Sequence, residues 1–88
     1  MFRVKITRTA VKDIKKLDMP LREKVLNLLK QVASDPKSRG RALQGKFSGM
    51  WRYRLGKLRI LVVIDEKNKV LEVHRVVWRK EAYEKGEK

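Results

Sequence analysis

The N-terminal segment alternates apolar with basic or polar side chains. Over residues 2–7 (FRVKIT) this period of two predicts a strand, because successive side chains of a strand point to opposite faces. The apolar face of this strand comprises Phe2, Val4 and Ile6.

The next segment has the spacing of an amphipathic helix. Thr9 is a candidate N-cap, because a threonine hydroxyl can accept a hydrogen bond from a backbone N–H of the first turn. The narrow apolar stripe comprises Val11, Ile14 and Leu17, and the outward face carries Lys12, Lys15 and Lys16. We interpret the lysines as an ordinary solvated face, although they could also contact RNA.

A second and stronger helical pattern follows. Asp18 is a candidate N-cap and Pro20 suits the first turn. The Asp35–Pro36 dipeptide ends the pattern, because the residue before a proline disfavours the helical conformation. The apolar stripe comprises Leu21, Val25, Leu28, Leu29 and Val32. Two successive amphipathic helices predict a helical hairpin that packs on a sheet.

After a glycine-containing loop at residues 36–46, the period of two returns. It predicts three strands, at residues 47–55, 58–64 and 70–77. Gly56 and Lys57 form the first tight turn, and residues 65–69 form the second, in which Asn68 is expected to adopt a positive φ. Connections this short favour antiparallel neighbours.

The predicted order of elements is β-α-α-β-β-β, which indicates an α+β fold with a helical hairpin packed on a small, mainly antiparallel sheet. We expect one domain over residues 1–88, because two separate cores would each be too small to fold alone. Residues 78–88 are expected to form a flexible C-terminal tail that holds one helical turn through Tyr83.

Composition excludes several kinds of chemistry. The chain has no cysteine and 1 histidine, which excludes a thiol nucleophile and a cysteine-based metal site and argues against a histidine-rich one. We therefore expect no cofactor and no small-molecule ligand. No apolar run approaches the ~20 residues of a membrane span, and the N-terminus lacks the apolar stretch of a signal peptide. A cytoplasmic protein without a membrane partner is the expectation.

The net charge of +14 indicates a polyanionic partner, either a nucleic acid or an acidic protein and less readily an anionic membrane. The charge is also segregated, because no acidic residue lies between Asp35 and Asp65. That interval contains Lys37, Arg39, Arg41, Lys46, Arg52, Arg54, Lys57 and Arg59. Basic strands can also simply protect sheet edges from aggregation, but the depletion spans a loop as well as strands and favours an anion site.

Strand parity concentrates the arginines further. Arg52 and Arg54 project together, whereas Trp51, Tyr53 and Leu55 project to the other face, where Trp51 and Tyr53 are expected to join the core. If Arg59 and Arg79 converge on the first pair, the result is a guanidinium cluster suited to a phosphodiester. Trp78 would either pack or offer a stacking platform. His74 is expected to be a half-buried strand residue.

Two stretches resemble a known family. The segment LQGKFSGMWRYRLGKLRILVVID, followed by a strand and then VVWRKEAY, is similar to RelE-type toxins of the RelE/ParE toxin–antitoxin superfamily. The resemblance covers nearly the whole chain. It implies an acidic, RelB-like antitoxin as partner.

The resemblance also implies a ribosome-dependent mRNA endonuclease. Such toxins cut the codon in the ribosomal A site without a metal, by attack of the RNA 2′-hydroxyl on the neighbouring phosphate. Matched by position, the catalytic residues would be Arg52, Arg54, Arg59, Arg79 and Tyr83. Contacts to RNA would come from Lys37, Arg39, Arg41, Lys46, Lys57 and Trp78.

Two positions depart from the pattern of these toxins. Many relatives have a lysine where this chain has Arg52 and Arg54, and arginine hardly deprotonates. Many also have a histidine at the position of Trp78, and His74 lies four residues earlier. The residue acting as general acid or base therefore stays open. So do two alternatives, an inhibitor of DNA gyrase like the ParE branch and an RNA-binding relative with weak or no catalysis.

Overall fold

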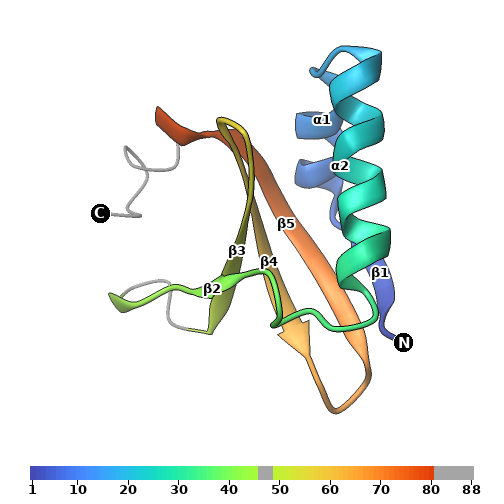
Figure 1. Ribbon diagram of the computed structural model, residues 1–88, viewed down its shortest axis with the longest axis vertical. Helices are drawn as coiled ribbons and strands as arrows, with labels where there is room; N and C mark the ends of the chain where they lie inside the picture. The colour runs from blue at the N-terminus through green and yellow to red at the C-terminus, as the bar shows by residue number, and fades with distance from the viewer. Residues whose placement is uncertain (46–48, 81–88) are drawn as a thin grey trace.

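Two helices cover one face of a five-stranded sheet (Figure 1). The computed structural model describes residues 1–45 and 49–80. The elements in chain order are β1 (Arg3–Ile6), α1 (Arg8–Lys15), α2 (Met19–Val32), β2 (Arg41–Ala42), β3 (Met50–Leu55), β4 (Leu58–Asp65) and β5 (Val70–Trp78). The strand order is β1-β5-β4-β3-β2, with β1 parallel to β5 and every other pair antiparallel. The predicted α+β fold is confirmed.

The core lies between the helices and the sheet. It is formed by the stripe of α2 and by alternate residues of the central strands, as the two periodicities predict. Its fully buried members include Val25, Leu29, Tyr53, Ile60, Val62, Leu71 and Val73. No helix in the described part of the chain is long and apolar enough to cross a membrane.

The first helix starts earlier than expected. Thr7, in an extended conformation, is the N-cap: its Oγ1 accepts a hydrogen bond from the Ala10 backbone N–H at 3.3 Å. The prediction of Thr9 was wrong, because β1 ends at Ile6 and leaves Thr7 at the junction. Asp18 caps α2 as predicted, since its carboxylate accepts from the Leu21 N–H at 3.0 Å. Pro20 occupies the first turn of α2, also as predicted.

The buried face of α1 also differs from the prediction. Val11 is exposed, and the inward positions are Ala10, Asp13, Ile14 and the following Leu17. Asp13 faces inward because β5 has no neighbouring strand beyond Val73, where its pairing with β1 ends. The side chains of α1 meet that open edge instead, as described next.

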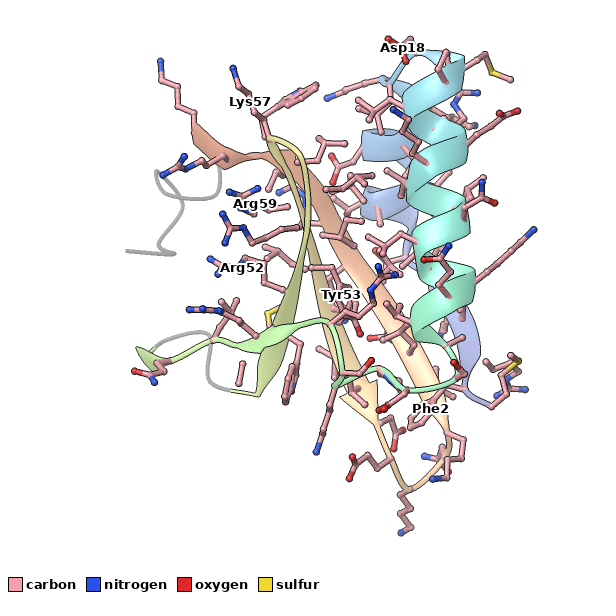
Figure 2. The ribbon with its side chains drawn as sticks, in the orientation of Figure 1. Phe2, Asp18, Arg52, Tyr53, Lys57 and Arg59 are labelled. Atoms are coloured by element: carbon pink, nitrogen blue, oxygen red, sulfur yellow. The ribbon has the colours of Figure 1, made fainter. Side chains whose placement is uncertain are left out.

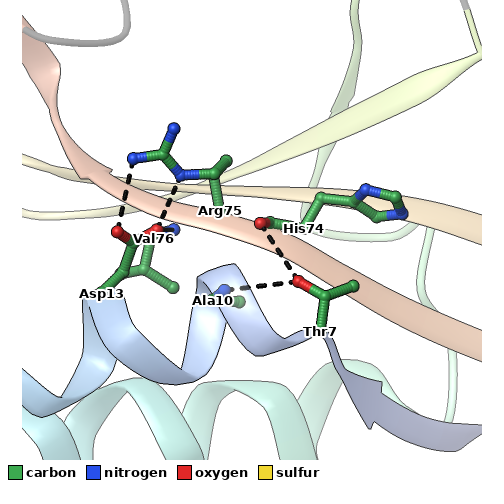
Figure 3. A network of polar contacts seen from close by, with 6 residues as sticks. All are labelled: Thr7, Ala10, Asp13, His74, Arg75 and Val76. Atoms are coloured by element: carbon green, nitrogen blue, oxygen red, sulfur yellow. Dashed lines mark hydrogen bonds and ion pairs between the residues drawn. The ribbon is translucent and has the colours of Figure 1, made fainter.

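A polar network joins α1 to the edge of β5 (Figure 3). The Asp13 carboxylate accepts hydrogen bonds from the Val76 backbone N–H at 2.9 Å and from Arg75 Nε at 2.8 Å. Thr7 Oγ1 donates to the His74 carbonyl at 3.4 Å. In a wider sheet, a neighbouring strand would form hydrogen bonds with these backbone groups of β5. Here the side chains of Thr7 and Asp13 form them instead, which fixes α1 in position beside the sheet.

Three local predictions need correction. The loop after α2 contains a short strand, β2, which sequence periodicity cannot reveal in two residues. In the β4–β5 turn the positive φ belongs to Lys69 (φ 56°), because Asn68 is held by its backbone and side-chain hydrogen bonds to Asp65. Trp78 is the last residue of β5 and not part of a tail. The predicted start of a strand at residue 47 and the helical turn at Tyr83 lie outside the described residues.

Tyr53 anchors the loop that leads from α2 to β2. Its ring is 1% exposed, and its hydroxyl donates to the Pro36 carbonyl at 2.5 Å. A Cβ on Gly40 would lie 2.9 Å from the Tyr53 ring, so the loop approaches the ring closely because residue 40 is a glycine. Burial, with a smaller effect of Asp35, raises the pKa of Tyr53 to about 12.

This raised pKa predicts a loss of stability at high pH. Below the ordinary tyrosine pKa of 10.0 the phenol is protonated in both states, and its contribution to stability is complete. Between that value and about 12 the unfolded chain loses the proton first, so stability falls as the pH rises. The expected loss across this range is about 3 kcal/mol. Denaturant unfolding at several pH values measures it, and Tyr53→Phe, which lacks the phenol, should show a flatter pH dependence over the same window.

Candidate functional site: an arginine face on the sheet

The β3–β4 hairpin gathers arginines on the face of the sheet that the helices leave uncovered. Arg54 is the cross-strand partner of Arg59, and Arg52 is the partner of Leu61 on one side and of Arg41 on the other. Directly paired residues share a face, so Arg41, Arg52, Arg54 and Arg59 lie together; we call these residues the arginine face. In Figure 2, Arg52 and Arg59 point away from the helices, whereas Tyr53 points toward them.

Two of these pairings place like charges directly opposite each other. Arg41 faces Arg52, and Arg54 faces Arg59. Like charges at directly opposed positions of a sheet are destabilising, by roughly 0.2–1 kcal/mol for each pair. A sequence selected only for stability would place a carboxylate or a threonine at one member of each pair. The arrangement makes this face a candidate anion site.

Arg59 is the most enclosed member of the arginine face. It is 3% exposed, and one nitrogen of its guanidinium donates to the carbonyls of Gly56 at 3.0 Å and Leu58 at 2.9 Å. These bonds hold the charged group against the β3–β4 turn. Arg54, in contrast, is exposed and also borders a groove between α2 and β3. The arginine face thus combines an enclosed guanidinium, held by the turn, with an exposed one.

The end of β5 lies beside the same turn. The Arg79 backbone N–H donates to the Lys57 carbonyl at 2.7 Å, which holds the chain after Trp78 next to the hairpin. Lys57, Trp78 and Arg79 are all exposed. The structure thus places the backbone of Arg79 and Lys57 at the hairpin end where Arg59 is held.

Other predicted RNA contacts lie elsewhere. Lys37 forms an ion pair with Glu66 at 2.8 Å and lies 5.7 Å from the centre of the Trp51 ring. The hydrogen bond from Lys37 is the main cause that lowers the pKa of Glu66. Arg39 donates to the side-chain oxygen of Gln31 on α2. Lys46 and Tyr83 lie outside the described residues, so their places in the site stay predictions.

The predicted burial of the two strand aromatics and of His74 agrees with the structure. Tyr53 is in the core as expected, and Trp51 is partly buried against it. His74 is half-buried and lies 2.5 Å from a carboxylate oxygen of Glu72. His74 lies in the middle of β5, whereas Trp78 is its last residue. His74 therefore does not occupy the position next to Arg79 where many relatives have a histidine. Arg75, on the same strand, is bound by Asp13.

Sequence reasoning missed the groove between α2 and β3. Its volume is about 330 Å³, and its lining includes Lys24, Asn27, Leu28 and Gln31 from one face of α2 and Arg39 and Arg54 from the other side. The signal that could have found it is the set of α2 positions 24, 27, 28 and 31, which share one face of a helix and mix polar with apolar residues. The groove is a second basic surface, adjacent to the arginine face at Arg54.

Comparison with known proteins agrees with this architecture. Residues 4–83 match the family model of the ParE toxin of the type II toxin–antitoxin system parDE. Comparison with curated protein sequences gives no match.

Among solved structures, the chain is similar to a chain of the toxin–antitoxin complex RelBE2 from Mycobacterium tuberculosis, with 26% identity, a TM-score of 0.83 and coverage of 89% of this chain and 98% of that one. It shares the fold of the archaeal RelE–RelB complex from Pyrococcus horikoshii (24% identity, TM-score 0.73, coverage of 89% and 94%). It also shares the fold of the isolated E. coli RelE toxin (21% identity, TM-score 0.77, coverage of 97% and 94%). The chain therefore belongs to the ParE toxin family of type II toxin–antitoxin systems, within the RelE/ParE superfamily.

Proposed function

We propose that this toxin is an endoribonuclease that cuts mRNA in the A site of the ribosome. The observation that carries the proposal is the register of β3 with β4 and β2, which places four arginines on one uncovered face in two like-charge pairs. Guanidinium groups bind phosphate in a bidentate way and keep their charge at every physiological pH. A phosphodiester on this face would be attracted by both like-charge pairs and would offset the repulsion within each of them.

The proposed reaction is an attack of the RNA 2′-hydroxyl on the adjacent phosphorus. The O2′–P bond forms and the P–O5′ bond breaks, which leaves a 2′,3′-cyclic phosphate and a free 5′-hydroxyl. The proton of the 2′-hydroxyl passes to water, and the leaving oxygen takes a proton from water. Negative charge accumulates on the phosphoryl oxygens in the transition state, and fixed cations stabilise it more than the ground state.

Each arginine has a proposed role. Arg54, exposed and opposite Arg59, approaches the 2′-hydroxyl, and Arg52 contacts the phosphate. Arg59, fixed by two carbonyls of the turn, supplies a preorganised charge, and Arg79 contributes a second phosphate contact beside it. Tyr83 would orient the nucleotide that is cut. None of these residues is a strong base, so we expect a slow reaction that depends on positioning by the ribosome.

The proposed partner in the resting cell is an acidic antitoxin. The charge of +14 supports it, and solved relatives of this fold are complexes of RelE with RelB. An acidic segment that folds on the toxin would neutralise the arginine face. Co-expression with small acidic proteins encoded beside the toxin, followed by pulldown, tests this partner. Recovery of ribosomes alone would contradict it.

A second function has specific support. The family model that matches is that of ParE toxins, and the ParE branch acts on DNA gyrase without cleaving RNA. The arginines at positions 52 and 54, where nuclease relatives often have lysine, also fit this branch. Expression in a bacterial host separates the two functions. Growth arrest with mRNA cut inside codons supports the nuclease, arrest with a DNA-damage response supports the gyrase inhibitor, and normal growth contradicts both.

A further inference from the structure

A hollow at the end of the sheet presents an exposed tryptophan. Trp78 is 45% exposed, although large aromatic side chains usually bury most of their surface. It lines a hollow of about 480 Å³ together with Lys57, Arg79 and Lys80. Trp78 is among the expected RNA contacts, but the roles proposed above for the arginines and Tyr83 do not say what it binds.

Trp78 is exposed although its position in the sheet points toward the core. It is the cross-strand partner of Leu58, a core residue, so its side chain starts on the face of the sheet that the helices cover. Trp78 nevertheless remains exposed, whereas Leu58 is fully buried. The indole ring is therefore presented at the end of β5 beside the β3–β4 turn.

The charges around the ring select the kind of ligand. Among the described residues, those that line the hollow beside Trp78 are Lys57, Arg79 and Lys80, all of them cationic. An exposed aromatic ring surrounded by cations suits a ligand in which a flat aromatic ring is connected to anionic groups on both sides. An unpaired nucleotide has this form, because every base offers a π-face and each is flanked by phosphates.

We propose that this hollow binds an unpaired base of single-stranded RNA, with the base stacked on Trp78 and its flanking phosphates beside Lys57 and Lys80. The hollow adjoins the arginine face at the hairpin end, because Arg79 N–H is bonded to Lys57 and Arg59 is held against Gly56. The stacked base would thus lie at the hairpin end that also holds Arg59, although the Trp78 side chain starts from the opposite face of the sheet. The identification of the bound RNA as the mRNA that is cut rests on the proposed nuclease function. The binding of an unpaired base to the hollow does not.

The experiment uses the fluorescence of Trp78. The chain has 2 tryptophans, so Trp51→Phe leaves Trp78 as the only indole. This variant is titrated with a short 2′-O-methyl RNA oligonucleotide, which cannot be cleaved, and with an abasic oligonucleotide of the same length and charge. We expect the first to quench the emission strongly and the second to bind more weakly without comparable quenching.

Substitutions then separate stacking from charge. With Trp51 intact and binding followed by a label on the oligonucleotide, Trp78→Leu is expected to weaken binding by about 10- to 100-fold, and Trp78→Phe much less. Lys57→Gln should reduce the slope of the logarithm of the binding constant against the logarithm of the salt concentration by about one. Because Trp78 is half exposed, these variants should fold, and thermal unfolding verifies it.

Two results would overturn the proposal. Equal quenching by the abasic oligonucleotide would mean that charge alone brings RNA to the surface. Quenching by poly-glutamate but not by RNA would assign the hollow to an acidic protein segment instead. The nuclease proposal fails separately: stacking with no cleavage of ribosome-bound mRNA by the wild type would leave the RNA site intact and remove only the catalytic function.

Discussion

Arg54→Gln is expected to lower the cleavage of ribosome-bound mRNA by about 10²–10³-fold, the typical cost of removing one hydrogen-bond donor from a charged transition state. Glutamine keeps the length and polarity of the side chain and removes its charge. Arg54 is exposed, so the core does not depend on it. The measurement is a single-turnover cleavage rate with purified ribosomes programmed with a defined mRNA.

The same substitution is expected to leave the fold unchanged or more stable. Arg54 lies directly opposite Arg59, and removing one charge of such a pair relieves roughly 0.2–1 kcal/mol of repulsion. Arg41→Thr, which separates the pair with Arg52, should stabilise the protein in the same way. A gain in stability combined with a loss of activity is typical of residues kept for function. Urea unfolding of each variant against the wild type measures the gain.

A matched control is available at the opposite edge of the sheet. Arg3→Gln makes the same chemical change on an exposed residue of β1, at the opposite end of the strand order. It should leave the cleavage rate within a few-fold of the wild type. If Arg3→Gln and Arg54→Gln reduced cleavage equally, overall charge and not the arginine face would control the reaction. An unchanged rate in Arg54→Gln would remove that residue from the site.

Local periodicity predicted most of the fold and the side of the sheet on which the arginines lie. The alternation in Trp51-Arg52-Tyr53-Arg54 assigns Tyr53 to the core and Arg52 to the opposite face, whatever the partner strands are. The two-residue turn at Gly56 fixes the pairing of β3 with β4, so Arg54 has to meet Arg59. These inferences need only neighbouring residues.

The features that sequence did not predict depend on distant residues. Asp13 faces inward because of the N–H of Val76, 63 positions later, and no helical period encodes that partner. Lys37 pairs with Glu66 in the distant β4–β5 turn, a contact that no local period encodes, and its predicted RNA contact stays a prediction.

The inward carboxylate of Asp13 should matter most for stability. Asp13→Ala is expected to lower the free energy of unfolding by about 3 kcal/mol, at the lower end of the cost of breaking a buried ion pair. The carboxylate is 8% exposed, and its loss leaves the Val76 N–H without an acceptor. The partner Arg75 has a side chain that is 30% exposed, so water compensates part of its lost bond. Urea unfolding measures the change.

Two further variants separate the contributions. Asp13→Asn keeps an oxygen for the Val76 N–H and loses only the charge, so it should cost less than Asp13→Ala. Arg75→Met removes the exposed partner alone and should cost about 1 kcal/mol. A double-mutant cycle between positions 13 and 75 then isolates the ion pair. If Asp13→Ala cost no more than Arg75→Met, the bond to the strand edge would contribute nothing, and the apolar contacts of Ala10 and Ile14 alone would hold α1 against β5.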